Sequence, residues 1–149
     1  MSCREKHQTE NCVCDILRQI VDAQSDIVEE CDIGCEQSIQ DLLGDVSSPT
    51  GLDTVPVLLY CECKTFKGYG VRNDQQKTVL ASFYFRVKKV DKDCCATLEL
   101  LRDPSDSQSN FQDPTKQKTA NLRATGICIT VDLKCFCHVT CLPAVRALG

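Results

Sequence analysis

The chain has 149 residues, a formal net charge of −4 and 13 cysteines. Its length suits one compact domain, which buries roughly two thirds of the surface that the unfolded chain exposes. The acidic balance, and the absence of a basic stripe with interleaved aromatic residues, argue against a protein that binds the phosphate backbone of nucleic acids.

The first 15 residues, MSCREKHQTENCVCD, are polar. They contain no apolar stretch that could form the core of a secretion signal, and no segment approaches the length of a membrane span. We therefore expect synthesis in a cytoplasm and no membrane span. So many cysteines are typical of disulfide-rich proteins in oxidising compartments. The sulfurs either bind metal or become oxidised late, after the compartment or the assembly state has changed.

Two helices are predicted after a polar tail at residues 1–11. Apolar residues recur at steps of three and four, the period of an amphipathic helix, at Val13, Ile16, Ile20, Ala23, Ile27 and Cys31. Asn11 is a suitable N-cap for this helix and Gly34 a suitable stop. A second short helix is expected at Cys35–Leu43, ended by Gly44, with its buried side at Ile39, Leu42 and Leu43.

Strands are predicted after the loop GDVSSPTGLD, because the chain becomes rich in β-branched and aromatic residues bounded by turn formers. The predicted strands are VPVLLYC (55–61), TVLASFYFRVKKV (78–90), CCATLELL (94–101) and GICITVDL (126–133). KGYG (67–70) and RNDQQK (72–77) are predicted turns. RDPSDSQSNFQDPTKQK is expected to be a surface loop, long enough to contact something else.

The predicted fold class is mainly β, with an antiparallel β-sandwich-like core and an N-terminal amphipathic helix. In the strand at 126–133, alternate residues from Ile127 to Leu133 share one face, while Cys128, Thr130 and Asp132 share the other. We expect a single domain over residues 1–149. It comprises the tail 1–11, a helical segment 12–44 and a β core 54–142 that includes the polar loop 103–118.

The spacing of the cysteines disfavours short local disulfides. Three pairs are separated by one residue: Cys12 and Cys14, Cys61 and Cys63, and Cys135 and Cys137. On a strand such sulfurs lie about 6.5 Å apart along one face, and on a helix they point in different directions, so neither arrangement closes a disulfide. The odd total leaves at least one thiol without a partner inside a monomer. Buried reduced thiols remain an alternative for any single cysteine.

The stretch CFCHVTC is weak evidence for a metal site or a catalytic site. Cys135, Cys137, His138 and Cys141 are the residue types that hold tetrahedral zinc, but the chain contains no C-x-x-C pair. A strand here would turn His138 away from Cys137, which also disfavours a local catalytic pair. No motif of a hydrolase, a nucleotide-binding protein or a metalloprotease is present. We expect no catalytic residue and no cofactor, and keep a zinc-binding or thiol-buffering protein as the alternative function.

Five segments carry a resemblance to a known family. They are NCVCD (11–15), VEECDIGC (28–35), DTVPVLLY (53–60), YFRVKKVDKDCCATLELLR (84–102) and CITVDLKCFCHVTCL (128–142). In this order they resemble the cysteine-rich spore coat protein Y and Z family of endospore-forming bacteria, which includes exosporium protein Y. The chain departs from the family pattern at His138, Val139 and Thr140, and the region around Cys61 and Cys63 matches weakly.

The resemblance implies a structural protein of the spore surface, in the coat crust or exosporium, made in the mother cell. Such proteins self-assemble into hexagonal two-dimensional layers cross-linked by disulfides. The implied partners are further copies of the chain, as hexamers and higher sheets, and other spore coat proteins. Because terminal segments can reach across gaps, we expect links between oligomers at Cys3, Cys12, Cys14 and Cys35. Intrachain or interface roles are expected for Cys31, Cys61, Cys63, Cys94, Cys95, Cys128, Cys135, Cys137 and Cys141.

Overall fold

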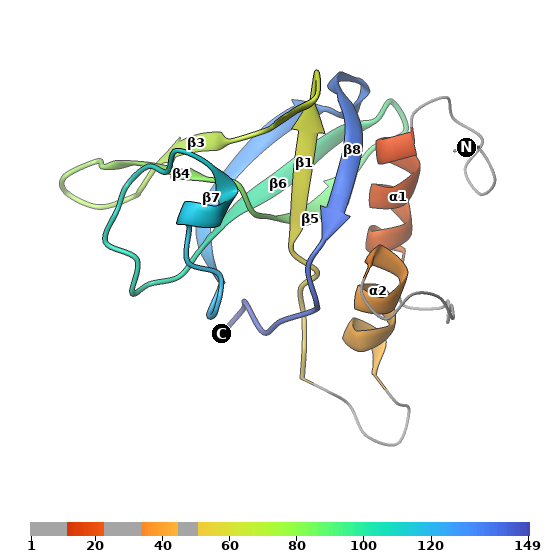
Figure 1. The fold of residues 1–149 in the computed structure, drawn as a ribbon, viewed down its shortest axis with the longest axis horizontal. Helices are drawn as coiled ribbons and strands as arrows, with labels where there is room; N and C mark the ends of the chain where they lie inside the picture. Colours follow the sequence, from red (N-terminus) through yellow and green to blue (C-terminus); the bar gives the residue numbers. More distant parts are fainter. Residues whose placement is uncertain (1–11, 23–33, 45–50) are drawn as a thin grey trace.

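The computed structural model describes residues 12–22, 34–44 and 51–149 (Figure 1). This part of the chain is mainly antiparallel β with two short α-helices, so the predicted fold class is confirmed. The helices are α1 (Cys12–Val21) and α2 (Cys35–Leu43). The strands are β1 (Val57–Cys61), β2 (Lys64–Thr65), β3 (Gly68–Val71), β4 (Val79–Ser82), β5 (Phe85–Val90), β6 (Cys95–Arg102), β7 (Arg123–Asp132) and β8 (Phe136–Cys141).

Six of the strands form one curled sheet in the order β2-β1-β5-β6-β7, with β8 paired to β1. β8 runs along the whole of β1, from Val57 opposite Cys141 to Cys61 opposite Phe136. Two strands pair with the other edge of β1: β5 pairs with Val57, and β2 pairs with Tyr60 and Cys61. The sheet therefore has β7 and β8 at its two sides (Figure 1).

The hairpin of β3 and β4 is a separate two-stranded sheet. The prediction of a turn at KGYG was wrong, since Gly68–Val71 is a strand. Its two glycines face the larger sheet, where a Cβ on Gly68 would meet Phe85 and Ile129 and one on Gly70 would overlap Ile127. Close packing of the β3 backbone on these side chains thus favours glycine at these alternate positions. The predicted turn at RNDQQK is confirmed, since it joins β3 to β4.

The strand predicted at residues 78–90 is divided into β4 and β5. Between them, the backbone N–H of Phe83 donates to the side chain of Gln117 and that of Tyr84 donates to Ser82 Oγ. Side-chain oxygens therefore accept the hydrogen bonds that these backbone N–H groups would donate to a neighbouring strand if the strand were continuous. The break lets the chain leave the small hairpin and enter the large sheet.

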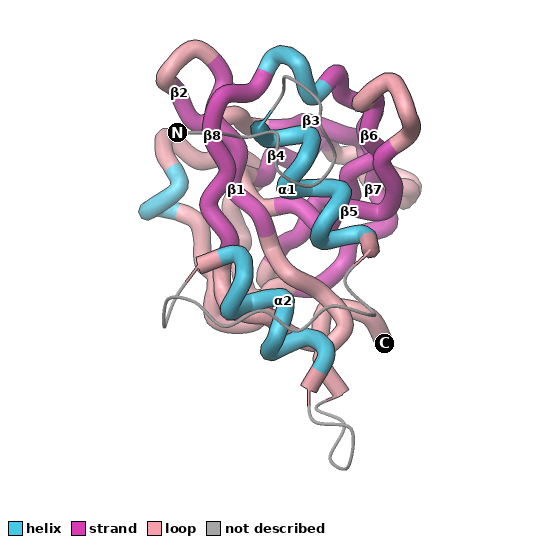
Figure 2. Tube along the Cα trace, turned by 90° about the vertical axis from the view of Figure 1, so that its right-hand side faces the viewer, coloured by secondary structure: helices cyan, strands magenta, loops and turns pink. Residues whose placement is uncertain are grey.

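Helix α1 packs its apolar side on the sheet, where it lies against β5 and β8 (Figures 1 and 2). Val13 and Ile20, two of the predicted positions, are buried together with Leu17, while the predicted Ile16 is partly buried against the same core. The helix ends at Val21, well before the predicted end, and is followed by a turn. The proposed cap at Asn11 and the apolar positions from Ala23 to Cys31 lie outside the described residues.

Helix α2 has the predicted bounds, and Gly44 ends it with a φ of 67°. Ile39 is buried, while Leu42 and Leu43 pack against the same core. Gly34, predicted to stop the first helix, is instead the N-cap of α2. No helix among the described residues has both the length and the apolar content needed to cross a membrane.

The apolar run of β1 is explained by two cores on its two faces. Val57 and Leu59 belong to the main core with both helices, whereas Leu58 belongs to a second core. The second core is closed by the segment after β6 and by the C-terminal residues, and its buried members are Leu58, Phe83, Tyr84, Leu101, Phe111, Leu122 and Ala147. Buried on both faces, β1 needs no alternation of polar and apolar residues.

The polar loop 103–118 is anchored to the sheet at both ends. Gln117 is buried and its amide group donates to Ser82 Oγ and to the Leu101 carbonyl. Arg102, at the end of β6, is also buried, and its guanidinium donates to the carbonyls of Ala81, Asp106 and Gln108. The loop therefore covers the second core as a folded part of the domain.

Candidate functional site: buried disulfides and exposed thiols

Between residues that the structure describes, three disulfides connect parts of the chain that are far apart in the sequence. Cys14 in α1 is bonded to Cys94 before β6, with a sequence separation of 80 and a Cα–Cα distance of 5.7 Å. Cys35 in α2 is bonded to Cys141 in β8 across 106 residues, with Cα atoms 4.7 Å apart. These two bonds fasten both helices to the sheet.

The third disulfide joins Cys61, at the end of β1, to Cys135, just before β8. The separation is 74 residues and the Cα–Cα distance is 5.8 Å. Cys135 is exposed and Cys61 partly exposed, whereas Cys14, Cys94 and Cys141 are buried. This disulfide is therefore the most accessible of the three to solvent.

The structure places two of the expected inter-oligomer cysteines differently from the expectation. Cys14 and Cys35 are paired inside the chain, because the helices that carry them pack directly on the sheet. Cys12 is also disulfide-bonded. Cys3 and Cys31 lie outside the described residues. Spacing alone could not show this, since it excludes local pairing without identifying distant partners.

Four described cysteines carry free thiols, and all four are exposed: Cys63, Cys95, Cys128 and Cys137. Each has a different local setting, so the thiols point outward from several places on the molecule.

Cys63 lies in the two-residue turn between β1 and β2. It has a φ of 64°, and the preceding Glu62 has a φ of 52°. Positive φ at both central residues is the feature of a type I′ turn, whose twist matches that of the strands it joins. The turn holds the Cys63 thiol at the tip of a hairpin.

Cys95 follows the turn between β5 and β6. The Asp91 carboxylate accepts the N–H groups of Asp93 and Cys95, and the N–H of Cys94 donates to the Asp91 carbonyl. Cys94 turns inward to its disulfide and Cys95 outward, so the adjacent cysteines have opposite environments.

Cys137 is an extra residue in β8, because the register with β1 shifts between the pairs Tyr60–His138 and Cys61–Phe136. Such a β-bulge re-aims side chains. Cys137 and His138 are therefore both exposed, although a regular strand would separate them. The Cys137 thiol lies 3.8 Å from the Tyr60 carbonyl, to which it donates a weak hydrogen bond.

The residues of CFCHVTC do not come together as a metal site. Cys135 and Cys141 belong to two different disulfides. His138 packs edge-on against Tyr60, with ring centroids 4.3 Å apart, and its Nε2 lies 3.1 Å from Thr140 Oγ1. Among residues 12–22, 34–44 and 51–149, no group of three or more His, Cys, Asp and Glu side chains could hold a metal ion.

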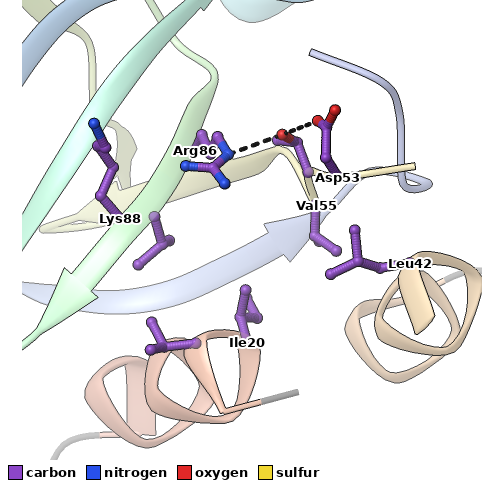
Figure 3. A pocket seen from close by; sticks show the side chains of 9 residues that line it. Ile20, Leu42, Asp53, Val55, Arg86 and Lys88 are labelled. Carbon is purple, nitrogen blue, oxygen red and sulfur yellow. Dashed lines mark hydrogen bonds between the residues drawn. The ribbon is translucent and has the colours of Figure 1, made fainter. Parts of the chain in front are cut away.

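A hollow of about 160 Å³ lies between the ends of the two helices and the sheet (Figure 3). Arg86 Nε donates to Thr54 Oγ1, and this hydroxyl donates to the Asp53 carboxylate. The same carboxylate accepts the N–H groups of Ala147 and Leu148. These polar groups hold the C-terminal segment on the sheet, which explains their presence structurally.

Comparison with known proteins identifies relatives of the chain. A family model described as spore coat protein Z matches residues 1–144, a range that contains all 13 cysteines. The spore coat protein Z of Bacillus subtilis (strain 168) is 33% identical to the chain over 141 residues, covering 91% of this chain and 90% of that protein. No solved structure matches the chain.

Proposed function

The chain belongs to the spore coat protein Z family and has a structural role in the spore coat. From this premise we propose that it self-assembles into a layer whose subunits are joined by disulfides between exposed thiols. The role involves no catalysis by the chain. The observation that carries the proposal is the division of the described cysteines into paired ones that brace the fold and unpaired ones that face solvent.

The positions of the four thiols suit a two-dimensional network. They lie on the β1–β2 hairpin, the start of β6, β7 and the bulge of β8, at residues Cys63, Cys95, Cys128 and Cys137. A subunit with two links forms only a chain, whereas three or more links in different directions form a sheet. Opening one link then leaves the others holding the subunit, which gives the layer its resistance.

The proposed assembly has two levels. A heterologous interface closes six copies into a ring, and disulfides join neighbouring rings into a hexagonal layer of the coat crust or exosporium. Cys3, which lies outside the described residues, remains a candidate for links between rings, together with the four exposed thiols. Synthesis in the mother cell keeps the thiols reduced until the layer forms, and other spore coat proteins anchor it.

Each link requires an oxidant. Two cysteine thiols form one S–S bond as a small-molecule disulfide of the oxidised glutathione class is cleaved and leaves as two thiols. The two protons of the cysteines are transferred to the departing thiolates, so protons and electrons balance.

Electron microscopy of the purified protein tests the proposal. The wild type is expected to form regular sheets under oxidation, which strong reductant breaks into small rings. A variant with Cys3, Cys63, Cys95, Cys128 and Cys137 all changed to Ser should stop at rings under the same oxidation. Uniform monomers of the wild type with and without reductant would remove the lattice proposal.

A further inference from the structure

β7 is an edge strand whose backbone is open to a partner. It has ten residues and pairs only with β6 among the described strands. The N–H of Leu133 donates to the Cys94 carbonyl, which makes Cys94 and Leu133 a hydrogen-bonded pair. In an antiparallel ladder such pairs alternate, so Val131 and Ile129 also bond to β6. The N–H and C=O groups of Cys128 and Thr130 therefore point away from the sheet.

No described group occupies this open edge. None of the hydrogen bonds of the described residues reaches the backbone of Cys128 or Thr130 from outside β6. Both side chains are exposed. The hairpin of β3 and β4 does not cover the edge with hydrogen bonds, because it packs on the face of the sheet that carries Ile127 and Ile129.

The second half of this edge also lacks the usual protection against strand pairing. Natural edge strands are kept apart by proline, lysine, bulges or short length. β7 has a bulge near its start, where its register with β6 shifts between Ala124 and Cys128. From Cys128 to Val131 the strand is regular, with no proline and no charge, and most of its residues are β-branched. The opposite edge is different, because β8 has six residues, a bulge at Cys137 and a disulfide at its last residue.

We infer that this edge is the seam between two copies of the chain, which pair their β7 strands antiparallel about Cys128. This inference rests on the proposed self-assembly and names its contact. An antiparallel arrangement is self-complementary, because the end that carries Arg123 in one copy lies beside the end that carries Asp132 in the other. Parallel pairing would instead place like charges together.

The geometry of the seam suits a disulfide between the two Cys128 residues. Their outward backbone groups make them a hydrogen-bonded pair, in which Cα atoms lie about 5.5 Å apart. This distance falls within the range of disulfides. The two thiols form the S–S bond as one small-molecule disulfide is reduced to two thiols, which keeps protons and electrons balanced.

The seam has the symmetry that links between rings require. It is isologous, since the same surface serves both copies, and it stops at two subunits. A hexagonal layer needs such a two-fold contact between rings in addition to the heterologous contact within each ring. The β7 seam thus supplies the first kind of contact and leaves the second to another surface.

Peptide mapping gives an unambiguous readout of the link. Trypsin cleaves after Arg123 and Lys134, and the peptide 124–134 contains Cys128 as its only cysteine. After oxidation with a small-molecule disulfide, unreduced digests of the wild type should contain this peptide as a disulfide-linked dimer. Cys128 bonded mainly to another cysteine would overturn the inference.

Thr130→Pro tests the backbone seam. Proline removes an N–H that points to solvent, so the ladder with β6 is kept. The variant should lose at least tenfold of the Cys128 peptide dimer, while the control Thr130→Val, which retains the N–H, should behave like the wild type. Peptide dimer at the wild-type level in Thr130→Pro would overturn the seam and leave the layer proposal standing.

Hydrogen exchange on the wild type needs no variant. Peptide 124–134 should exchange at least tenfold more slowly in oxidised sheets than in the reduced rings. Unchanged exchange in sheets that do form would also contradict the seam. Absence of sheets from the oxidised wild type is a different result, because it would contradict the proposed function itself.

Discussion

At the scale of single residues, Cys94 adopts a conformation that normally favours glycine, with a φ of 63° at the β5–β6 turn. Its disulfide to Cys14 is one reason why a cysteine stands there, since this bond fixes α1 to the sheet. Arg18 strengthens the same junction, because its guanidinium donates to the carbonyls of Asp91 and Lys92. The side chain of Cys94 therefore stabilises the fold through its disulfide, while the positive φ of the same residue destabilises the fold.

These opposing effects are separable by mutation. Cys14→Ala with Cys94→Ala should lower the free energy of unfolding by about 4 kcal/mol, since the lost bond closes a long loop. Cys14→Ala with Cys94→Gly should be about 1 kcal/mol more stable than that variant, because glycine tolerates the positive φ. Urea denaturation measures both differences, with Cys95→Ser as the exposed control. Equal stability of the Ala and Gly variants would contradict the strain at residue 94.

At the scale of elements, the loop 103–118 is held by its acidic residues. Asp103 accepts the N–H and hydroxyl of Ser105 and the N–H of Asn121. These hydrogen bonds, those of Ser105 first, lower the pKa of Asp103. Asp113 caps the short 3-10 helix at Pro114–Lys116, and the side chain and then the backbone of Thr115 lower its pKa.

The lowered pKa values predict that acid loosens this loop. The charged carboxylates stabilise the folded chain above the pKa of an unfolded aspartate, about 4, and this contribution is lost as the pH falls through the lower folded pKa. Asp103→Asn with Asp113→Asn should therefore lower the unfolding temperature at pH 7. The difference from the wild type should shrink progressively below pH 4. A difference that stays constant from pH 7 to pH 2 would contradict this origin of the stability.

The sequence predicted elements well where side-chain period and environment agree. Alternation in GICITVDL matches β7, where Ile127 is buried and Cys128 and Thr130 are exposed. β3 was missed because its inward residues are glycines, Gly68 and Gly70, and their close packing on the sheet leaves no hydrophobic signal. The break between β4 and β5 was missed for a different reason. It depends on hydrogen bonds from Gln117, which is remote in sequence.

At the scale of the whole molecule, the cysteine partners could not be predicted from spacing. Each described disulfide spans 74 residues or more, so its formation depends on the tertiary fold. Spacing did indicate that partners must be distant. The exposure of Cys63, Cys95, Cys128 and Cys137 also needed the structure, since turns and a bulge orient three of these four thiols.

The same distribution of sulfurs predicts that reductant acts in stages. Links between exposed thiols and the accessible Cys61–Cys135 bond should be reduced first, because thiolate attack requires access to sulfur. The Cys14–Cys94 bond is buried beneath α1 and should resist until the chain opens. Increasing reductant should therefore release folded subunits before it unfolds them. Timed alkylation with mass spectrometry, alongside circular dichroism, follows both steps, and reduction of Cys14–Cys94 before the sheets dissolve would contradict this order.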